Sequence, residues 1–578
     1  MTNLFPRSIL VPACVLWLAG CATSAVPDGE SAPPATAEAK PAKDDLPKLE
    51  LEPSVMYDVL AGEIALQRGQ VNGAAQALGR AAQRTRDPRL AERATLAAFH
   101  ARQFNDALSA AELWVALRPK EVEAREALGT VLLELGQAPE AQRELEEMLA
   151  LEEARGHLDQ GYLRAATILG RNGNRAAATE IMESLVRRHP ESGAAHLYAA
   201  HLAVRAGDLD GAARLADVAL ARQPDSEDAA VFRVRIMISQ KDLSAARAFY
   251  ESFLKSYPRA ASVRLSYARF LIDQKQWERA LAQFRRLLSD TPDDADAAYA
   301  AGLLALQTNQ IAEAERYLQR TIELRPENDQ ARLYLGQAAE QEKRYDDAVR
   351  WYREIDSPES YFEAQTRLAI VLARQGDVEA ARAQLRSIQP DGDQQEVQRV
   401  LTEEQILREA KRHDEALEVL NQAIDTMPND KDLLYARALI AEKLGMINLA
   451  EADLRAILKA DPKNANALNA LGYTLADRTT RYQEAYELLQ QAIVLKPDDP
   501  FVLDSLGWVH YRLGNHTEAL KTLRRALDVR NDAEIAAHLG EVLWVTGQRN
   551  EAETVWNRAL RATPDNDSLL DVIKKFKQ

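Results

Sequence analysis

Small and apolar residues recur along most of the chain at a fixed spacing. Alanine returns every 34 residues in one series, and proline does so in another. The alanines are Ala178, Ala212, Ala246, Ala280 and Ala314, and the prolines are Pro190, Pro224, Pro258, Pro292 and Pro326. A period of this size is typical of stacked helix pairs that bury their apolar faces against their neighbours. The pattern therefore predicts an array of helix pairs.

Units near the carboxyl terminus carry a fuller version of this pattern. Leu-Gly pairs stand at 471–472, 506–507 and 539–540; further small residues are Gly514, Gly547, Ala485, Ala519 and Ala552; prolines are Pro497 and Pro564. Small residues let two helices approach, glycine supports the turn, and proline cannot continue a helix. The motif resembles the tetratricopeptide repeat. That resemblance implies an all-α fold, a right-handed superhelical solenoid of tetratricopeptide helix-turn-helix repeats.

Extending this register predicts fifteen repeats between about residues 55 and 566. They begin near residues 55, 88, 122, 159, 193, 227, 261, 295, 329, 362, 397, 431, 465, 500 and 533. The spacing slips around Asp391, and the unit beginning at Asp329 is shortened around Pro358, so we expect a kink or boundary near 357–396.

The expected organisation is an amino-terminal array over 51–360, a carboxyl-terminal array over 361–566 and a capping helix over 567–578. The apolar residues expected to face back onto the array from that cap are Leu569, Leu570, Val572, Ile573 and Phe576.

The amino terminus has the layout of an export signal. An apolar run from Ser8 to Ala19 is too short to span a membrane as a helix, and it ends in Leu-Ala-Gly-Cys at residues 18–21. This resembles a bacterial lipobox, which implies a signal peptide over 1–20 and lipidation of Cys21. Ala22 stands where the family's inner-membrane retention signal has aspartate, so we expect an outer-membrane lipoprotein facing the periplasm. A simple secretory signal is the alternative.

Residues 21–50 are expected to form a lipidated, disordered tether. Five prolines stand among Ala, Ser, Glu and Lys in this segment. Such a mixture has too little apolar surface to order itself. The lipid anchor is thus the expected membrane contact, and the array would extend beyond it.

The charge of the chain narrows the class of partner. It carries 72 basic and 88 acidic residues, a net charge of −16, without a lysine or arginine run. Nucleic acid is therefore not an expected partner. Abundant Ala, Leu, Glu, Gln and Arg agree with an all-helical protein.

Motifs for catalysis and metal binding are missing from the sequence. The nine histidines form no H-E-x-x-H pair, and neither a phosphate-binding loop nor a G-x-S-x-G motif occurs. His196 and His201 are five residues apart, which does not place them on one helical face. We expect no enzyme, no cofactor, no metal and no small-molecule substrate.

A non-catalytic solenoid generally binds through the concave surface lined by its first helices. In the tetratricopeptide family these positions recur in each unit, and aromatic and arginine side chains there are typical of binding hot spots. The protein-binding candidates in the last three repeats are Asn466, Asn469, Tyr473, Asp477, Asp504, Trp508, Tyr511, Arg512 and Trp544. The alternative is that Trp508 and Trp544 are packed between superhelical turns.

The stretch from Gly472 to Leu520 is the most distinctive part of the array. Together with the lipobox, tether and array length, it resembles the outer-membrane tetratricopeptide lipoproteins that partner the periplasmic carboxyl-terminal processing protease. The resemblance implies an adaptor that holds the protease and peptidoglycan hydrolases together and so promotes hydrolase degradation. The alternative is a structural assembly lipoprotein, pilotin-like or accessory to barrel assembly. An enzyme with an unrecognised site is a third possibility.

Overall fold

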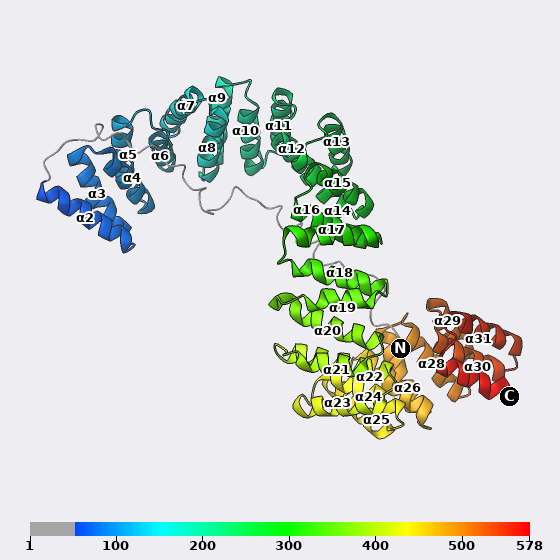
Figure 1. Ribbon diagram of the computed structural model, residues 1–578. Coiled ribbons are helices and arrows are strands. Elements are labelled where there is room, and N and C mark those ends of the chain that lie inside the picture. Colours follow the sequence, from blue (N-terminus) through cyan, green and yellow to red (C-terminus); the bar gives the residue numbers. More distant parts are fainter. Residues whose placement is uncertain (1–51, 578) are drawn as a thin grey trace. The chain divides into compact units, whose positions relative to one another are not determined.

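A computed structural model describes residues 52–577, which form helices and connecting turns without a strand in that range. Helices α2 to α31 make fifteen consecutive helix-turn-helix pairs, and α32 follows the last pair. The even-numbered helix opens each pair and the odd-numbered helix closes it (Figure 1). The predicted all-α repeat fold is therefore confirmed. The predicted signal peptide, Cys21 and the tether over 21–50 lie outside the described residues.

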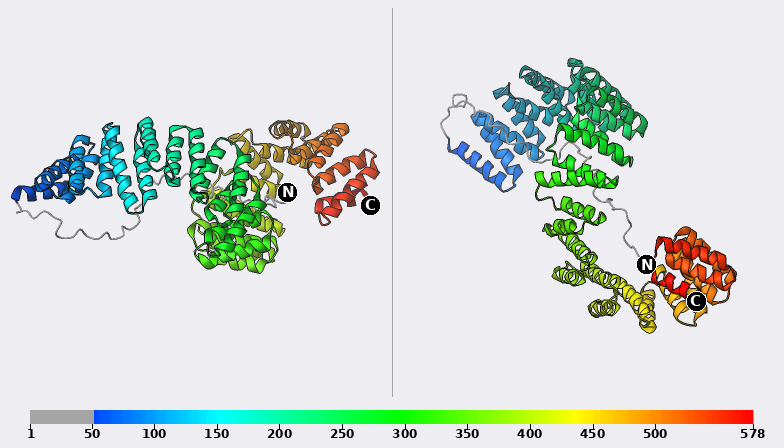
Figure 2. Two further views of the ribbon diagram at one scale, coloured as in Figure 1. Left: turned by 90° about the horizontal axis from the view of Figure 1, so that it is seen from above. Right: turned by 45° about the vertical axis from the view of Figure 1, so that its right-hand side comes forward.

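The chain divides into two compact units, up to Tyr317 and from Leu318 onward. Within the first unit, successive helix pairs stack side by side (Figure 2). Its helices are α2 (Pro53–Gln67), α3 (Val71–Thr85), α4 (Pro88–His100), α5 (Phe104–Leu117), α6 (Val122–Glu134), α7 (Ala138–Ala154), α8 (Leu158–Arg171), α9 (Arg175–Arg188), α10 (Gly193–Ala206), α11 (Leu209–Arg222), α12 (Glu227–Ser239), α13 (Leu243–Ser256), α14 (Ala261–Asp273), α15 (Trp277–Asp290) and α16 (Ala295–Gln307). Helix α17 (Ile311–Leu324) contains the division.

The second unit continues the same pairing of helices. Its helices are α18 (Asp329–Gln341), α19 (Tyr345–Arg353), α20 (Pro358–Arg374), α21 (Val378–Ser387), α22 (Asp393–Glu409), α23 (His413–Thr426), α24 (Lys431–Lys443), α25 (Ile447–Ala460), α26 (Ala465–Arg478), α27 (Tyr482–Leu495), α28 (Pro500–Arg512), α29 (His516–Val529), α30 (Ala533–Val545), α31 (Arg549–Ala562) and α32 (Asp567–Lys577). The predicted division of the array at residue 361 falls inside this unit and remains a prediction.

Small residues occupy the contacts within each pair. All five alanines of the 34-residue series are buried on the second helices of their pairs. A Cβ atom built on Gly507 would lie 2.6 Å from Cγ of Leu523, so a larger residue there would push α28 and α29 apart. Gly514 has a φ of 81° between those helices, but Lys241 takes a φ of 63° at an equivalent turn. Glycine is therefore favoured at the turn without being required.

Two helices near the predicted irregularity are short. Helix α19 has nine residues and α21 has ten. Helix α20 begins at Pro358 and α22 at Asp393, each about four residues before the predicted starts of their repeats. The Asp329 carboxylate accepts hydrogen bonds from the backbone N–H groups of Asp356 and Ser357, at 3.1 and 2.8 Å. These bonds satisfy backbone donors at the early start of α20.

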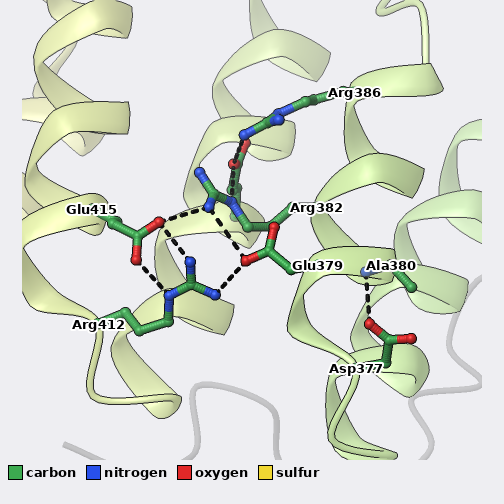
Figure 3. A network of polar contacts seen from close by, with 8 residues as sticks. Asp377, Glu379, Ala380, Arg382, Arg386, Arg412 and Glu415 are labelled. Carbon is green, nitrogen blue, oxygen red and sulfur yellow. Dashed lines mark hydrogen bonds and ion pairs between the residues drawn. The ribbon is translucent and has the colours of Figure 1, made fainter.

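A cluster of arginines and carboxylates joins α21, α22 and α23 (Figure 3). Arg382 donates to Glu403 at 2.9 Å and to Glu415 at 2.8 Å, and its side chain is only 11% exposed. Arg412 bridges Glu415 and Glu379 across the turn between α22 and α23. The buried Glu403 thus replaces the Leu-Gly pair of other repeats with an ionic connection to the preceding repeat.

The last helix covers the end of the second unit. Leu569 of α32 is fully buried, and Phe576 lies with its ring centroid 6.4 Å from that of Trp556. Leu570, which the pattern places against the array, is instead 42% exposed, because consecutive helical residues point in different directions.

Candidate functional site

Six of the nine groove residues predicted from the sequence form one connected group in the second unit. They are Tyr473 and Asp477 on α26 and Asp504, Trp508, Tyr511 and Arg512 on α28. His538 on α30 completes the group, which we call the aromatic network. The three helices begin after Asn464, Asp499 and Asp532, whose side chains accept backbone N–H bonds. These caps fix where each helix starts and hence which residues meet.

Trp508 is the packed centre of the aromatic network. Only 6% of its surface is exposed, and its ring stacks on that of His538 with 4.3 Å between centroids. Its indole N–H donates to Oδ1 of Asp477 at 3.2 Å. Trp508 therefore joins three successive repeats and offers little of its own surface to a partner.

His538 is the member of the network that sequence reasoning missed. Its Nδ1 lies 2.9 and 3.0 Å from the two carboxylate oxygens of Asp504. Burial alone would lower the pKa of His538, but the carboxylate of Asp504, with smaller effects of Asp477 and Glu534, raises it. The signal was present in the repeat period, because His538 follows Asp504 by 34 residues. Equivalent positions on consecutive first helices are neighbours.

Tyr511 and Arg512 form the more accessible edge of the network. Both are half-buried. Arg512 donates to the hydroxyl of Tyr482 at 2.7 Å, and its guanidinium carbon lies 5.0 Å from the centroid of that ring. The hydroxyl of Tyr511 donates to Glu541 at 3.4 Å. An aromatic ring and a guanidinium held in place by neighbours lose little conformational entropy when a partner binds.

Tyr473 lies deeper on α26 and faces the same carboxylates. Its ring centroid is 6.0 Å from that of His538. Burial, together with the nearby charges of Asp477 and Asp504, raises the pKa of Tyr473 well above its ordinary value. The phenol is therefore a neutral hydrogen-bonding group at physiological pH.

The other three predicted residues lie apart from this network. Asn466 is exposed and accepts from Nζ of Lys496 at 2.9 Å. Asn469 is 8% exposed, and its Oδ1 is buried with no hydrogen-bond partner within the described residues. Trp544 stacks against Trp556 at 5.6 Å and so belongs to the contacts around the capping helix. The concave-face assignment of the nine residues remains a prediction.

Other kinds of site were sought among residues 52–577. No group of three or more His, Cys, Asp or Glu side chains in this range is arranged to hold a metal ion. None of the helices that the structure describes has the length and apolar character needed to cross a membrane. An open surface hollow of about 560 Å³ lies along α19 and α20, away from the aromatic network.

Comparisons with known proteins agree with the helix pairing. A family model described as Tetratricopeptide repeat matches residues 163–227, 299–361, 435–500 and 505–567. A second model of the same description matches residues 237–304. A crystal structure of an APC/C hetero-tetramer, Cut9–Hcn1, is 16% identical, covers 91% of this chain and 97% of that chain, and gives a TM-score of 0.30.

Similar curated proteins are bacterial in two cases. A TPR repeat-containing protein of Pseudomonas aeruginosa is 43% identical over 197 residues, which are 34% of this chain and 33% of that protein. The type IV pilus assembly protein PilF of the same species is 28% identical over 128 residues, or 22% of this chain and 50% of PilF. The chain thus spans a third and a half of these relatives. The helix pairs and both family models together show that this chain belongs to the tetratricopeptide-repeat family.

Proposed function

We propose that this chain is a non-catalytic adaptor, anchored by lipid on Cys21 to the periplasmic side of the outer membrane. It holds a periplasmic carboxyl-terminal processing protease and the peptidoglycan hydrolases that the protease degrades. Tetratricopeptide repeats are protein-binding scaffolds, and the lipobox and the stretch 472–520 support the compartment and the partner. The observation that carries the proposal is the accessible edge of the aromatic network, Tyr511 and Arg512, held in place by three repeats.

Holding two proteins on one array accelerates their encounter without new chemistry. Once both are bound, each meets the other at an effective concentration that can reach about the millimolar range for short linkages. Fifteen helix pairs offer separate surfaces to the two partners. The adaptor should therefore raise the rate of hydrolase degradation while leaving the protease chemistry unchanged.

We expect Arg512→Ala to weaken binding of one of the two partners by more than about 1 kcal/mol, or about fivefold in Kd. The physical reason is loss of the guanidinium at the accessible edge of the network. The measurement is binding of purified protease and hydrolase to the mature chain, together with the rate of hydrolase degradation. Trp508→Ala is less informative because Trp508 is buried, and its loss would disturb packing.

Arg524→Ala is the matched control for this experiment. Arg524 is an exposed arginine on α29, the second helix of the same repeat. Its replacement should leave binding and degradation unchanged. If the mature chain binds neither protein, or does not speed degradation, the adaptor proposal fails. Equal effects of Arg512→Ala and Arg524→Ala would remove the aromatic network from it.

A second candidate is an assembly lipoprotein that binds other envelope proteins. The similarity to the type IV pilus assembly protein PilF favours this candidate. Co-purification from detergent-solubilised membranes separates the two: a protease with hydrolases supports the adaptor, whereas components of a pilus or barrel-assembly complex support the assembly role.

We expect Cys21→Ser to abolish lipid attachment, because lipobox modification requires the cysteine thiol. Incorporation of radiolabelled palmitate into the wild-type and variant chains is the measurement. Cys14→Ser is the matched control, since Cys14 lies in the segment that would be removed. Labelling of Cys21→Ser at the wild-type level would exclude this anchor.

A further inference from the structure

Four arginines lie on the first helices of four consecutive repeats in the first unit. They are Arg171 on α8, Arg205 on α10, Arg235 on α12 and Arg269 on α14, and we call them the arginine strip. Arg171 and Arg205 are 34 residues apart, and so are Arg235 and Arg269. His201 connects the two pairs, because it precedes Arg205 by four residues and Arg235 by 34. Residues four apart share a helix face, so the four arginines follow one face of the array.

Contacts between neighbouring helices agree with this register. The ring of His201 on α10 lies 3.8 Å from that of Phe232 on α12, centroid to centroid. Burial, with a smaller effect of the positive charge of Arg235, lowers the pKa of His201 to about 4. A Cβ atom built on Gly170 would lie 3.4 Å from Nη1 of Arg205, so this guanidinium reaches the end of α8 beside Arg171.

The arginine strip lacks counter-ions within residues 52–577. None of its four guanidinium groups makes an ion pair or a side-chain hydrogen bond with another described residue. Arg171, Arg205 and Arg235 are exposed, and Nε of the half-buried Arg269 is buried without a partner. Elsewhere in the array, arginines on first helices are neutralised; Arg437, for example, forms a bidentate pair with Asp453.

Unpaired positive charges in an otherwise acidic chain point to an anionic ligand. Exposed apolar residues share the same helices: Ile238 is 37% exposed one turn beyond Arg235, and Leu163 is 46% exposed two turns before Arg171. Asp159 and Asp228 stand at the beginnings of α8 and α12, and Asp273 ends α14. These acids and apolar groups disfavour a uniformly charged polymer such as nucleic acid.

We propose that the arginine strip binds an acidic, extended segment of a partner polypeptide. Neighbouring helices lie roughly 10 Å apart, so four consecutive first helices span roughly 30 Å. An extended chain advances about 3.3 Å per residue, which gives about nine residues with a carboxylate at about every third position. Its apolar side chains would meet Ile238 and Leu163. This inference concerns the first unit and does not depend on the protease proposed above.

The test measures binding of a fluorescein-labelled peptide of three Asp-Val-Thr repeats to the full mature chain by fluorescence anisotropy. A peptide with Asn in place of Asp is the ligand control. We expect the Asp peptide to bind at least about tenfold more tightly, and high salt to weaken it. Arg235→Gln with Arg269→Gln should weaken binding at least about tenfold.

The matched control is Arg214→Gln with Arg222→Gln on α11. Both arginines are exposed on a second helix, and the double change removes the same net charge. Binding should stay within about twofold of wild type because neither residue belongs to the strip. The exposed Arg205→Gln is a second test variant if loss of the half-buried Arg269 impairs folding.

Three results would overturn the proposal. The first is equal binding of the Asp and Asn peptides. The second is an equal loss in both double variants, which would indicate a response to net charge alone. The third is tighter binding of a single-stranded DNA oligonucleotide than of the Asp peptide with the same arginine dependence, which would assign the strip to a phosphate polymer.

Discussion

Replacing Trp556 with alanine is expected to lower the free energy of unfolding of the last repeat by about 3–5 kcal/mol. Trp556 is 1% exposed and stacks between Trp544 and Phe576, so its loss removes the aromatic centre on which α32 packs. A Cβ atom on Gly540 would lie only 1.9 Å from its indole nitrogen. The ring therefore fills the space left by that glycine, and alanine would leave a cavity.

The damage should remain local because repeats in a solenoid contact mainly their neighbours. Hydrogen exchange should accelerate in α30, α31 and α32 and stay unchanged in the first unit. Val494→Ala is the control, since Val494 is 79% exposed and its truncation should change stability by less than about 0.5 kcal/mol. Uniform loosening of both units, or no effect of Trp556→Ala, would contradict local packing by this ring.

Replacing Arg382 with methionine is expected to destabilise the connection of α21, α22 and α23 by about 3–5 kcal/mol. Arg382 is 11% exposed and Glu403 is 5% exposed, so the substitution leaves a buried carboxylate without its principal partner. Loss of Arg382 also removes one of the ion pairs of Glu415. Thermal unfolding and hydrogen exchange across these helices are the measurements.

Arg386→Met provides the matched control on the same helix. Arg386 also faces Glu403, at 3.5 Å, but its side chain is 60% exposed and solvent weakens the interaction. Its replacement should cost less than about 1 kcal/mol. If the two substitutions have equal effects, burial of the Arg382–Glu403 pair does not stabilise this part of the unit.

Part of the candidate site could be predicted because it follows the repeat register. Tyr473, Asp477 and Trp508 were found by their positions on the first helices, and the structure places them in contact. Their role as a surface does not follow from register. Trp508 turned out to be buried because His538 lies flat against it, and a spacing pattern contains no information on which ring covers which.

The arginine–carboxylate cluster was hidden for a related reason. Glu403 and Glu404 appear in the sequence only as a departure from the Leu-Gly pair. Their partners come from different helices, Arg382 from α21 and Arg408 from α22 itself. A substitution of charge for small apolar residues is therefore interpretable only when the neighbouring helix is in place.

The sequence by itself determined the class of fold, the number of helix pairs and the register of each first helix. These properties are periodic: helix packing needs small residues at recurring positions, and Ala280 or Gly507 satisfies that need wherever the period places it. Only the tertiary structure decided which side chains are buried, which charges are neutralised and which remain open. Those outcomes depend on pairs of residues from neighbouring helices, such as Asp504 with His538, whose distance is set by packing and not by the period alone.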